Sequence, residues 1–234
     1  MRDPLLISII IPTLNEGRNI VSLITFLKTG FEEKSVEIIV SDGQSNDDTV
    51  LKAKNAGAKV ILCPTKGRAY QMNFAASIAN GQILYFLHAD TVPPITFKND
   101  ILKAVEEGFD LGRYRTKFQS NSLLLKMNSF FTRFDFTFCY GGDQTLFIRK
   151  ELFDRIGGFN SDMRIMEDYD IVKRARKLGT YKILRSKVLV SARKYMGNSW
   201  LKVQLANLKI MKMFQNGASQ EEMIRKYNEI ITYR

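Results

Sequence analysis

Residues 5–27 read LLISIIIPTLNEGRNIVSLITFL, and this stretch decides the fold class. The run from Leu5 to Ile11 is apolar and rich in β-branched isoleucine, which is typical of a strand covered on both faces. Asn15, Glu16 and Gly17 interrupt the apolar run, and apolar side chains then recur at helical spacing between residues 20 and 27. The stretch predicts a strand, a polar turn and a helix, which is the first unit of an α/β protein.

The same alternation repeats along the first half of the chain. Apolar runs predict strands at residues 36–40, 59–63 and 83–87. Between the first two, Ser45 and the acidic residues behind it indicate a helix start, and Gly57 indicates its end. Strands and helices that alternate at roughly twenty-residue spacing predict βαβ units and a mostly parallel sheet. Such open sheets bind ligands outside the carboxyl ends of their strands.

Beyond residue 108 the pattern changes. Strands are expected at residues 109–118 and 145–149, with an apolar helix at 120–138 and a short helix at 151–156. A helix beginning at Glu167 ends near Gly179, and residues 188–190 predict a last edge strand. Two helices, 198–215 and 219–232, finish the chain, the second opening on the capping box Ser219–Glu222. We expect residues 1–195 to form one α/β domain and residues 196–234 a helical extension packed on or beside it.

Composition limits the function classes. The 234 residues are 45% hydrophobic, which is enough for a sizeable core, and the formal net charge is +11. This charge favours an anionic partner: nucleic acid, anionic lipid or a phosphate-bearing substrate. Cys63 and Cys139 have no paired spacing, which indicates reduced thiols rather than a zinc site. No segment has the roughly 20 apolar residues of a membrane-spanning helix, so we expect a cytoplasmic protein, with peripheral contact at the inner membrane face left open.

Two acidic residues follow predicted strands and are candidate ligand contacts. Asp90 is the best metal-ligand candidate, because a hard divalent cation bridging a diphosphate needs only one or two protein carboxylates. His88 is a second candidate ligand for Mn²⁺ or Mg²⁺, with a packed histidine as the alternative. Asp42 could accept hydrogen bonds from a base or ribose, with Gly43 permitting a sharp turn. The alternative for Asp42 is a plain Asp-Gly turn.

Cations and a carboxylate pair complete the candidate site. Lys66 and Arg68 flank Gly67 before a predicted helix, which suits phosphate oxygens or a solvated turn. Glu167 and Asp168 stand in the first turn of a predicted helix, where the helix dipole favours ionised carboxylates. An ionised carboxylate is what a general base requires, although acidic residues are also common at helix starts.

The order of these motifs resembles the family 2 glycosyltransferases of the GT-A fold, over about residues 5–195. In that family the segment matching Ile9–Glu16 opens the nucleotide-sugar site, and the Asp matching Asp42 holds the base. The Asp-x-Asp metal motif matches residues 88–90, and the catalytic pair matches Glu167–Asp168. Residues 86–91 (FLHADT), 142–144 (GDQ) and 166–168 (MED) further resemble the bacterial subgroup called radical-SAM/selenodomain-associated transferase 2.

The resemblance implies an inverting, metal-dependent transfer of a sugar from a UDP- or GDP-linked donor to an acceptor hydroxyl, with Asp168 as the base. It implies these nucleotide-sugar contacts: Pro12, Thr13, Asn15, Glu16, Asp42, Ala89 and Asp90. From the residues themselves, Lys66 and Arg68 are further candidate contacts, and Arg193 is either a diphosphate contact or surface charge. It implies acceptor-side contacts at Gly142, Asp143 and Gln144. The sequence departs from the family at His88, where the motif has Asp. The Gln-x-x-Arg-Trp motif of processive synthases is absent, so polymer synthesis is not expected.

Other functions stay open from the sequence. A sugar-phosphate nucleotidyltransferase shares the sheet type but usually has a Gly-rich, Arg-bearing loop where this chain has Pro-Thr-Leu-Asn-Glu. A basic nucleic-acid or membrane-surface module with a non-catalytic site suits the charge but not the Glu167–Asp168 pair, so no nucleic-acid partner is expected. The helix at 198–215 either packs its apolar side on the domain, leaving its lysines solvated, or lies on an anionic membrane next to a lipid-linked acceptor.

Overall fold

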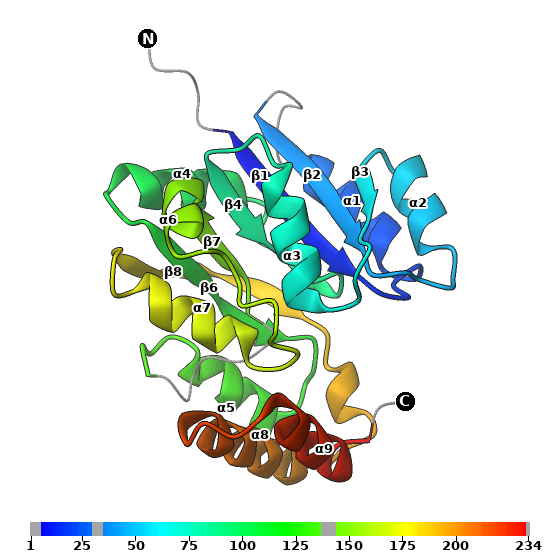
Figure 1. The fold of residues 1–234 in the computed structure, drawn as a ribbon, viewed down its shortest axis with the longest axis vertical. Coiled ribbons are helices and arrows are strands. Elements are labelled where there is room, and N and C mark those ends of the chain that lie inside the picture. The colour runs from blue at the N-terminus through cyan, green and yellow to red at the C-terminus, as the bar shows by residue number, and fades with distance from the viewer. Residues whose placement is uncertain (1–5, 30–34, 137–143, 233–234) are drawn as a thin grey trace.

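The structure, a computed structural model, describes residues 6–29, 35–136 and 144–232. Figure 1 shows one central sheet with helices on both faces and a separate group of helices at one end. The strands are β1 (Ile7–Thr13), β2 (Val36–Asp42), β3 (Lys59–Leu62), β4 (Ile83–Phe86), β5 (Thr91–Val92), β6 (Leu111–Phe118), β7 (Leu146–Arg149) and β8 (Tyr181–Val190). The α-helices are α1 (Ile20–Thr29), α2 (Thr49–Asn55), α3 (Arg68–Ser77), α4 (Phe97–Glu106), α5 (Leu123–Phe131), α6 (Lys150–Arg155), α7 (Glu167–Ala175), α8 (Trp200–Gln215) and α9 (Gln220–Ile230).

The sheet has the order β3-β2-β1-β4-β7-β6-β8-β5. The β1–β2, β1–β4 and β2–β3 pairs are all parallel, which confirms the predicted βαβ units. β7 runs antiparallel to both β4 and β6, whereas β6 and β8 are parallel. The carboxyl ends of β1, β2 and β4 therefore meet at one edge, as the sequence predicted for the ligand side of the sheet.

Both faces of the sheet are buried, which explains why the N-terminal run is apolar except at Ser8, itself fully buried. Ile7, Ile9 and Ile11 pack in one core with residues of α1, α2 and α4. Ile10 points to the other face and packs in a second core with residues of α3, α6 and α7. A strand covered on only one face would instead alternate apolar and polar residues.

Two expected elements differ in the structure. The edge strand expected at 188–190 is wrong: β8 is ten residues long and lies between β6 and β5. The edge is β5, two residues whose partners in β8 are Val190 and Leu189. The sequence gives no signal for β5, because Pro93 and Pro94 follow it directly. The helix expected at 120–138 is also shorter, since α5 ends at Phe131.

Both C-terminal helices begin with a serine cap, of which the sequence predicted the one at Ser219. Ser219 and Glu222 form the capping box of α9, and the Ser199 side chain accepts a hydrogen bond at the start of α8. α8 buries Val203, Ala206 and Ile210 and is linked to α5 by a bond from Trp200 Nε1 to Asn128 Oδ1 of 3.2 Å. The division of the chain at residue 195 stays a prediction. Within the described ranges, no helix is both long and apolar enough to cross a bilayer.

Candidate active site

A cleft of roughly 1090 Å³ lies at the carboxyl edge of the sheet, between the loops that follow the strands and the C-terminal helices. Seven of the predicted site residues line it: Asn15, Glu16, Arg68, Asp90, Gln144, Asp168 and Arg193. Seven others are not among its described lining residues: Pro12, Thr13, Asp42, Lys66, His88, Ala89 and Glu167. Gly142 and Asp143 lie outside the described residues. The structure therefore brings together side chains from most of the predicted motifs in one hollow.

Asp42 joins the ends of β1 and β2. Its side chain is only 1% exposed, and its Oδ1 accepts hydrogen bonds from Thr13 Oγ1 at 3.1 Å and from Ser45 Oγ at 2.6 Å. Its Oδ2 accepts from the Ser45 amide at 2.8 Å. The carboxylate thus links the end of β1 to the loop that follows β2. Its contact with a base or ribose stays a prediction.

Gln71 on α3 is a structural residue that sequence reasoning missed. Its buried side-chain amide donates to the carbonyl oxygens of Thr13 at 2.8 Å and Ser41 at 2.7 Å. A Cβ added at Gly43 would lie 2.9 Å from this amide, so a larger residue there would push Gln71 away from its two carbonyl partners. The positive φ of the turn, 69°, belongs to Gln44 instead. No sequence pattern marked Gln71, because its partners are main-chain carbonyls distant along the chain.

Arg193 bridges two acids that the sequence placed at separate strand ends. Its Nη2 lies 2.7 Å from Glu16 Oε1, and its Nε lies 3.2 Å from Asp90 Oδ2. The antiparallel β5–β8 pairing makes this possible, since it fixes the end of β8 against the loop that carries Asp90. The Ser191 amide also donates to the Asp90 carbonyl at 3.2 Å. Arg193 therefore holds Glu16 and Asp90 together at the lining of the cleft.

Arg68 contacts both members of the carboxylate pair. Its Nε donates to Glu167 Oε1, and its Nη2 lies 3.0 Å from Asp168 Oδ2. Glu167 is fully buried, and its Oε2 has no hydrogen-bond partner among the described residues. The Asp168 side chain is 18% exposed and lines the cleft. The geometry gives Arg68 a role that the sequence did not predict, which is to hold the pair together. It also makes Asp168 the member that a ligand can reach.

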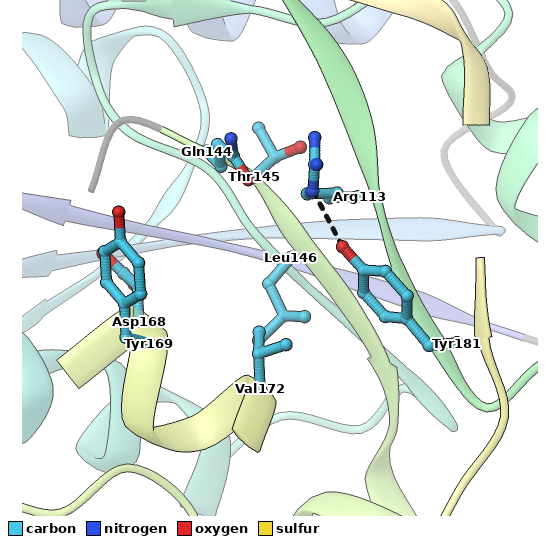
Figure 2. Close-up of a pocket in the computed structure, with 8 residues that line it drawn as sticks. All are labelled: Arg113, Gln144, Thr145, Leu146, Asp168, Tyr169, Val172 and Tyr181. Atoms are coloured by element: carbon cyan, nitrogen blue, oxygen red, sulfur yellow. Dashed lines mark hydrogen bonds between the residues drawn. The ribbon is translucent and has the colours of Figure 1, made fainter. Parts of the chain in front are cut away.

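A small pocket of about 20 Å³, large enough for one water molecule, lies beside Asp168, and Figure 2 shows the residues that line it. Asp168 and Tyr169 of α7 lie on one side, and Arg113 and Tyr181 lie on the other. Arg113 Nε donates to the Tyr181 hydroxyl at 2.8 Å, and burial raises the pKa of Tyr181 to about 12. Gln144 lines both this pocket and the cleft, so it lies beside Asp168 as an acceptor-side residue would.

Gln220, the first residue of α9, holds the loop that leads to the carboxylate pair. Its Oε1 accepts from the amides of Arg164 at 3.0 Å and Ile165 at 3.1 Å. The next residue, Met166, has a left-handed φ of 69° and is the N-cap residue immediately before α7. The first residue of α9 is therefore hydrogen-bonded to the segment that precedes Glu167. The capping box in the sequence predicted where α9 begins. It did not predict that Gln220 accepts hydrogen bonds from the loop before α7.

The described residues contain no group of three or more His, Cys, Asp or Glu side chains that could hold a metal on their own. Asp90 nevertheless fits a shared site, because Mg²⁺ usually binds through one or two carboxylates together with substrate phosphates and water. The carboxylate lines the cleft with its side chain 21% exposed. Ligation by His88, which is partly buried, stays a prediction.

Comparison with known proteins agrees with this geometry. Residues 8–167 match the family described as Glycosyl transferase family 2. The chain is 33% identical over 98 residues to glucosyl-3-phosphoglycerate synthase of Mycobacterium tuberculosis, a segment that covers 38% of this chain and 30% of that protein. The chain therefore matches less than a third of this curated relative's length.

Two solved structures have the same fold at low identity. The mannosyltransferase PcManGT from Pyrobaculum calidifontis, in complex with GDP-Man and Mn²⁺, aligns with a TM-score of 0.70 at 16% identity, over 98% of this chain and 70% of that one. S. aureus TarS 1-349, in complex with UDP-GlcNAc, aligns with a TM-score of 0.68 at 17% identity, over 97% and 71% of the two chains. The fold is thus the GT-A fold expected from the sequence.

Proposed function

Because this chain belongs to glycosyl transferase family 2, we propose that it transfers a sugar from a nucleoside-diphosphate donor to an acceptor hydroxyl, with inversion at the sugar carbon. Family membership argues against the two alternatives left open by the sequence, a nucleotidyltransferase and a non-catalytic binding module. The UDP-GlcNAc and GDP-Man complexes of the structural neighbours support a UDP- or GDP-linked donor. The radical-SAM-associated subgroup stays a prediction.

One observation carries the proposal: Asp168 reaches the cleft while its neighbour Glu167 is buried. In the proposed reaction Asp168 removes the proton of the acceptor hydroxyl as that oxygen bonds to the sugar carbon. The bond between the sugar and the diphosphate breaks at the same time. Arg68 fixes the orientation of the Asp168 carboxylate through the 3.0 Å contact.

The diphosphate is proposed to lie at the opposite side of the cleft, near Arg193. This guanidinium is 56% exposed and can exchange part of its contact with Glu16 and Asp90 for phosphate oxygens. Asp90, with His88 as the predicted second ligand, would hold a Mn²⁺ or Mg²⁺ ion whose charge offsets the negative charge on the departing diphosphate. Lys66, which precedes α3, is proposed to add positive charge nearby.

Thermal-shift measurements identify the donor. UDP, GDP and their sugar conjugates are tested with and without Mn²⁺ or Mg²⁺. A ligand at a hundred times its Kd should add about 2.7 kcal/mol to the free energy of unfolding. Asp90→Ala should remove the metal-dependent part of that gain. The donor assignment fails if no nucleotide raises the Tm. The metal assignment fails if the ion changes nothing or if Asp90→Ala behaves as the parent protein does.

Turnover measurements then test the base. Asp168→Asn should lower kcat by about 10² to 10⁴ and leave nucleotide affinity nearly intact. Asp162→Asn is the matched control, because this exposed acid lies in the loop that precedes α7 and its backbone amide donates to Asn160 Oδ1. Normal turnover of Asp168→Asn would move the base to another residue. Loss of nucleotide binding would make Asp168 a ligand contact instead.

A further inference from the structure

The outward face of α8 is apolar. Leu201, Leu205 and Leu208 are 59%, 55% and 58% exposed and follow one another at intervals of four and three residues, so they form one stripe. This stripe lies opposite the buried face formed by Val203 and Ile210. One of the two readings of the sequence had the apolar side of this helix packed on the domain and its lysines on the outward face. The structure instead places leucines among them.

A second apolar face lies nearby on α5. Leu123 is 79% exposed, and Met127 and Phe130 are 42% and 47% exposed. Figure 1 shows α5, α8 and α9 grouped at one end of the molecule, and Trp200 joins α8 to α5 through its bond to Asn128. We call the apolar and basic residues of this end that are exposed, or in the case of Lys202 partly exposed, the α5–α8 surface, which comprises Leu123, Leu124, Lys126, Met127, Phe130, Phe131, Met196, Leu201, Lys202, Leu205, Leu208, Lys209 and Lys212.

The charge of the α5–α8 surface has one sign. Neither α5 nor α8 contains an Asp or Glu, while Lys126, Lys202, Lys209 and Lys212 lie among the apolar residues. The wider segment 171–220 contains twelve Lys or Arg and no Asp or Glu. The surplus of the whole chain, +11, is therefore concentrated in the part that includes α8.

We propose that the α5–α8 surface binds the surface of an anionic lipid bilayer. A bilayer offers both of the environments this surface needs: an acyl region for the leucines and anionic headgroups for the lysines. A second copy of the chain would place the same lysines against each other, since a two-fold interface uses the same patch on both subunits. The combination of leucine and lysine without acidic residues thus favours lipid over self-association.

The α5–α8 surface borders the cleft, so binding to a bilayer would also place the cleft near the membrane. Phe131, Met196 and Leu208 are exposed and also line the cleft that contains Asp168. Docking through these residues would hold the cleft mouth at the headgroup level. If the proposed glycosyl transfer is correct, a hydroxyl carried on a membrane lipid could then reach Asp168. Binding to the bilayer itself does not depend on that reaction.

Vesicle co-sedimentation tests the proposal with the full chain and without any nucleotide. The vesicles are phosphatidylcholine alone or phosphatidylcholine with phosphatidylglycerol, at low and high salt. We expect sedimentation with the anionic vesicles at low salt, weakened by high salt. Lys202/Lys209/Lys212→Gln should lower the partition coefficient by about fivefold per lysine, and Leu201/Leu205/Leu208→Gln should lower it at least tenfold.

Leu51/Leu62/Leu178→Gln is the matched control, because it removes three leucines of similar exposure from distant elements. This control should sediment as the parent does. Equal recovery in the supernatant with all vesicles would overturn the proposal, and so would equal loss in both leucine variants. A dimer in light scattering that Leu201/Leu205/Leu208→Gln dissociates would show that a second copy covers the surface. These outcomes are independent of turnover, so failure here and failure of the proposed reaction can be told apart.

Discussion

Replacing Arg68 should destabilise the protein mainly through the buried carboxylate that it contacts. Glu167 Oε1 accepts from Arg68, and Glu167 Oε2 has no hydrogen-bond partner among the described residues. Arg68→Met would therefore leave a fully buried carboxylate without a charged partner. Breaking a buried pair by removing one partner costs about 3–5 kcal/mol. Because the Arg68 side chain is 37% exposed, water can enter the vacated space, and we expect about 2–3 kcal/mol.

Urea unfolding measures this loss. With an m-value of about 2–3 kcal/mol/M for a protein of this size, the midpoint should fall by about 1 M. Glu167→Gln in the Arg68→Met background should recover at least about 1 kcal/mol, because it removes the unpaired charge. Arg155→Met is the control, since Arg155 is exposed and, within the part of the chain that the structure describes, donates to the Leu178 carbonyl alone. This variant should change stability by about 0.5 kcal/mol or less.

The reasoning would be refuted if Arg68→Met and the control shifted the midpoint equally. It would also be refuted if Glu167→Gln made the Arg68→Met variant less stable. Either result would mean that the carboxylate does not need the guanidinium. Holding the pair together would then not be the function of Arg68, and its exposed part would be left for phosphate binding as the sequence predicted.

Three further predictions concern one hydrogen-bonded side chain and two buried titratable groups. Gln220→Leu should raise hydrogen exchange at amides 164–165 about fivefold to tenfold, because each lost bond contributes about 1 kcal/mol, whereas Gln220→Glu keeps the acceptor and should keep the protection. The pKa of Tyr181 is raised by burial from 10.0 to about 12. Between these two pH values the unfolded chain has lost the proton and the folded protein keeps it, so the free energy of unfolding should fall as pH rises. In Tyr181→Phe the slope of unfolding free energy against pH should be smaller by about 1.4 kcal/mol per pH unit, and equal slopes would contradict the assignment. Burial also raises the pKa of Cys63, which is 1% exposed, so in a Cys139→Ser background a thiol reagent should label it only after unfolding.

The sequence by itself determined the βαβ half of the sheet and the motifs that follow its strands. Local patterns suffice there, because a buried parallel strand is apolar throughout and a helix shows its own period. The run Ile7–Ile11 and the capping box at Ser219 were both identified in this way, and the structure has a strand and a helix there. Asp90 was found because a carboxylate that follows an apolar run is conspicuous, and Asp168 was found because it belongs to an acidic pair that begins a predicted helix; both line the cleft.

Only the tertiary structure decided which of these groups touch. Arg68 and Glu167 lie 99 residues apart, and Arg193 and Glu16 lie 177 apart. Their pairing depends on the order of β7, β6, β8 and β5, for which pairing between strands distant in sequence leaves no local pattern. The leucine stripe of α8 was likewise hidden, because a helix with apolar residues on two faces does not show which face the core covers. That choice depends on the shape of the rest of the fold, against which Val203 is buried and Leu205 is not.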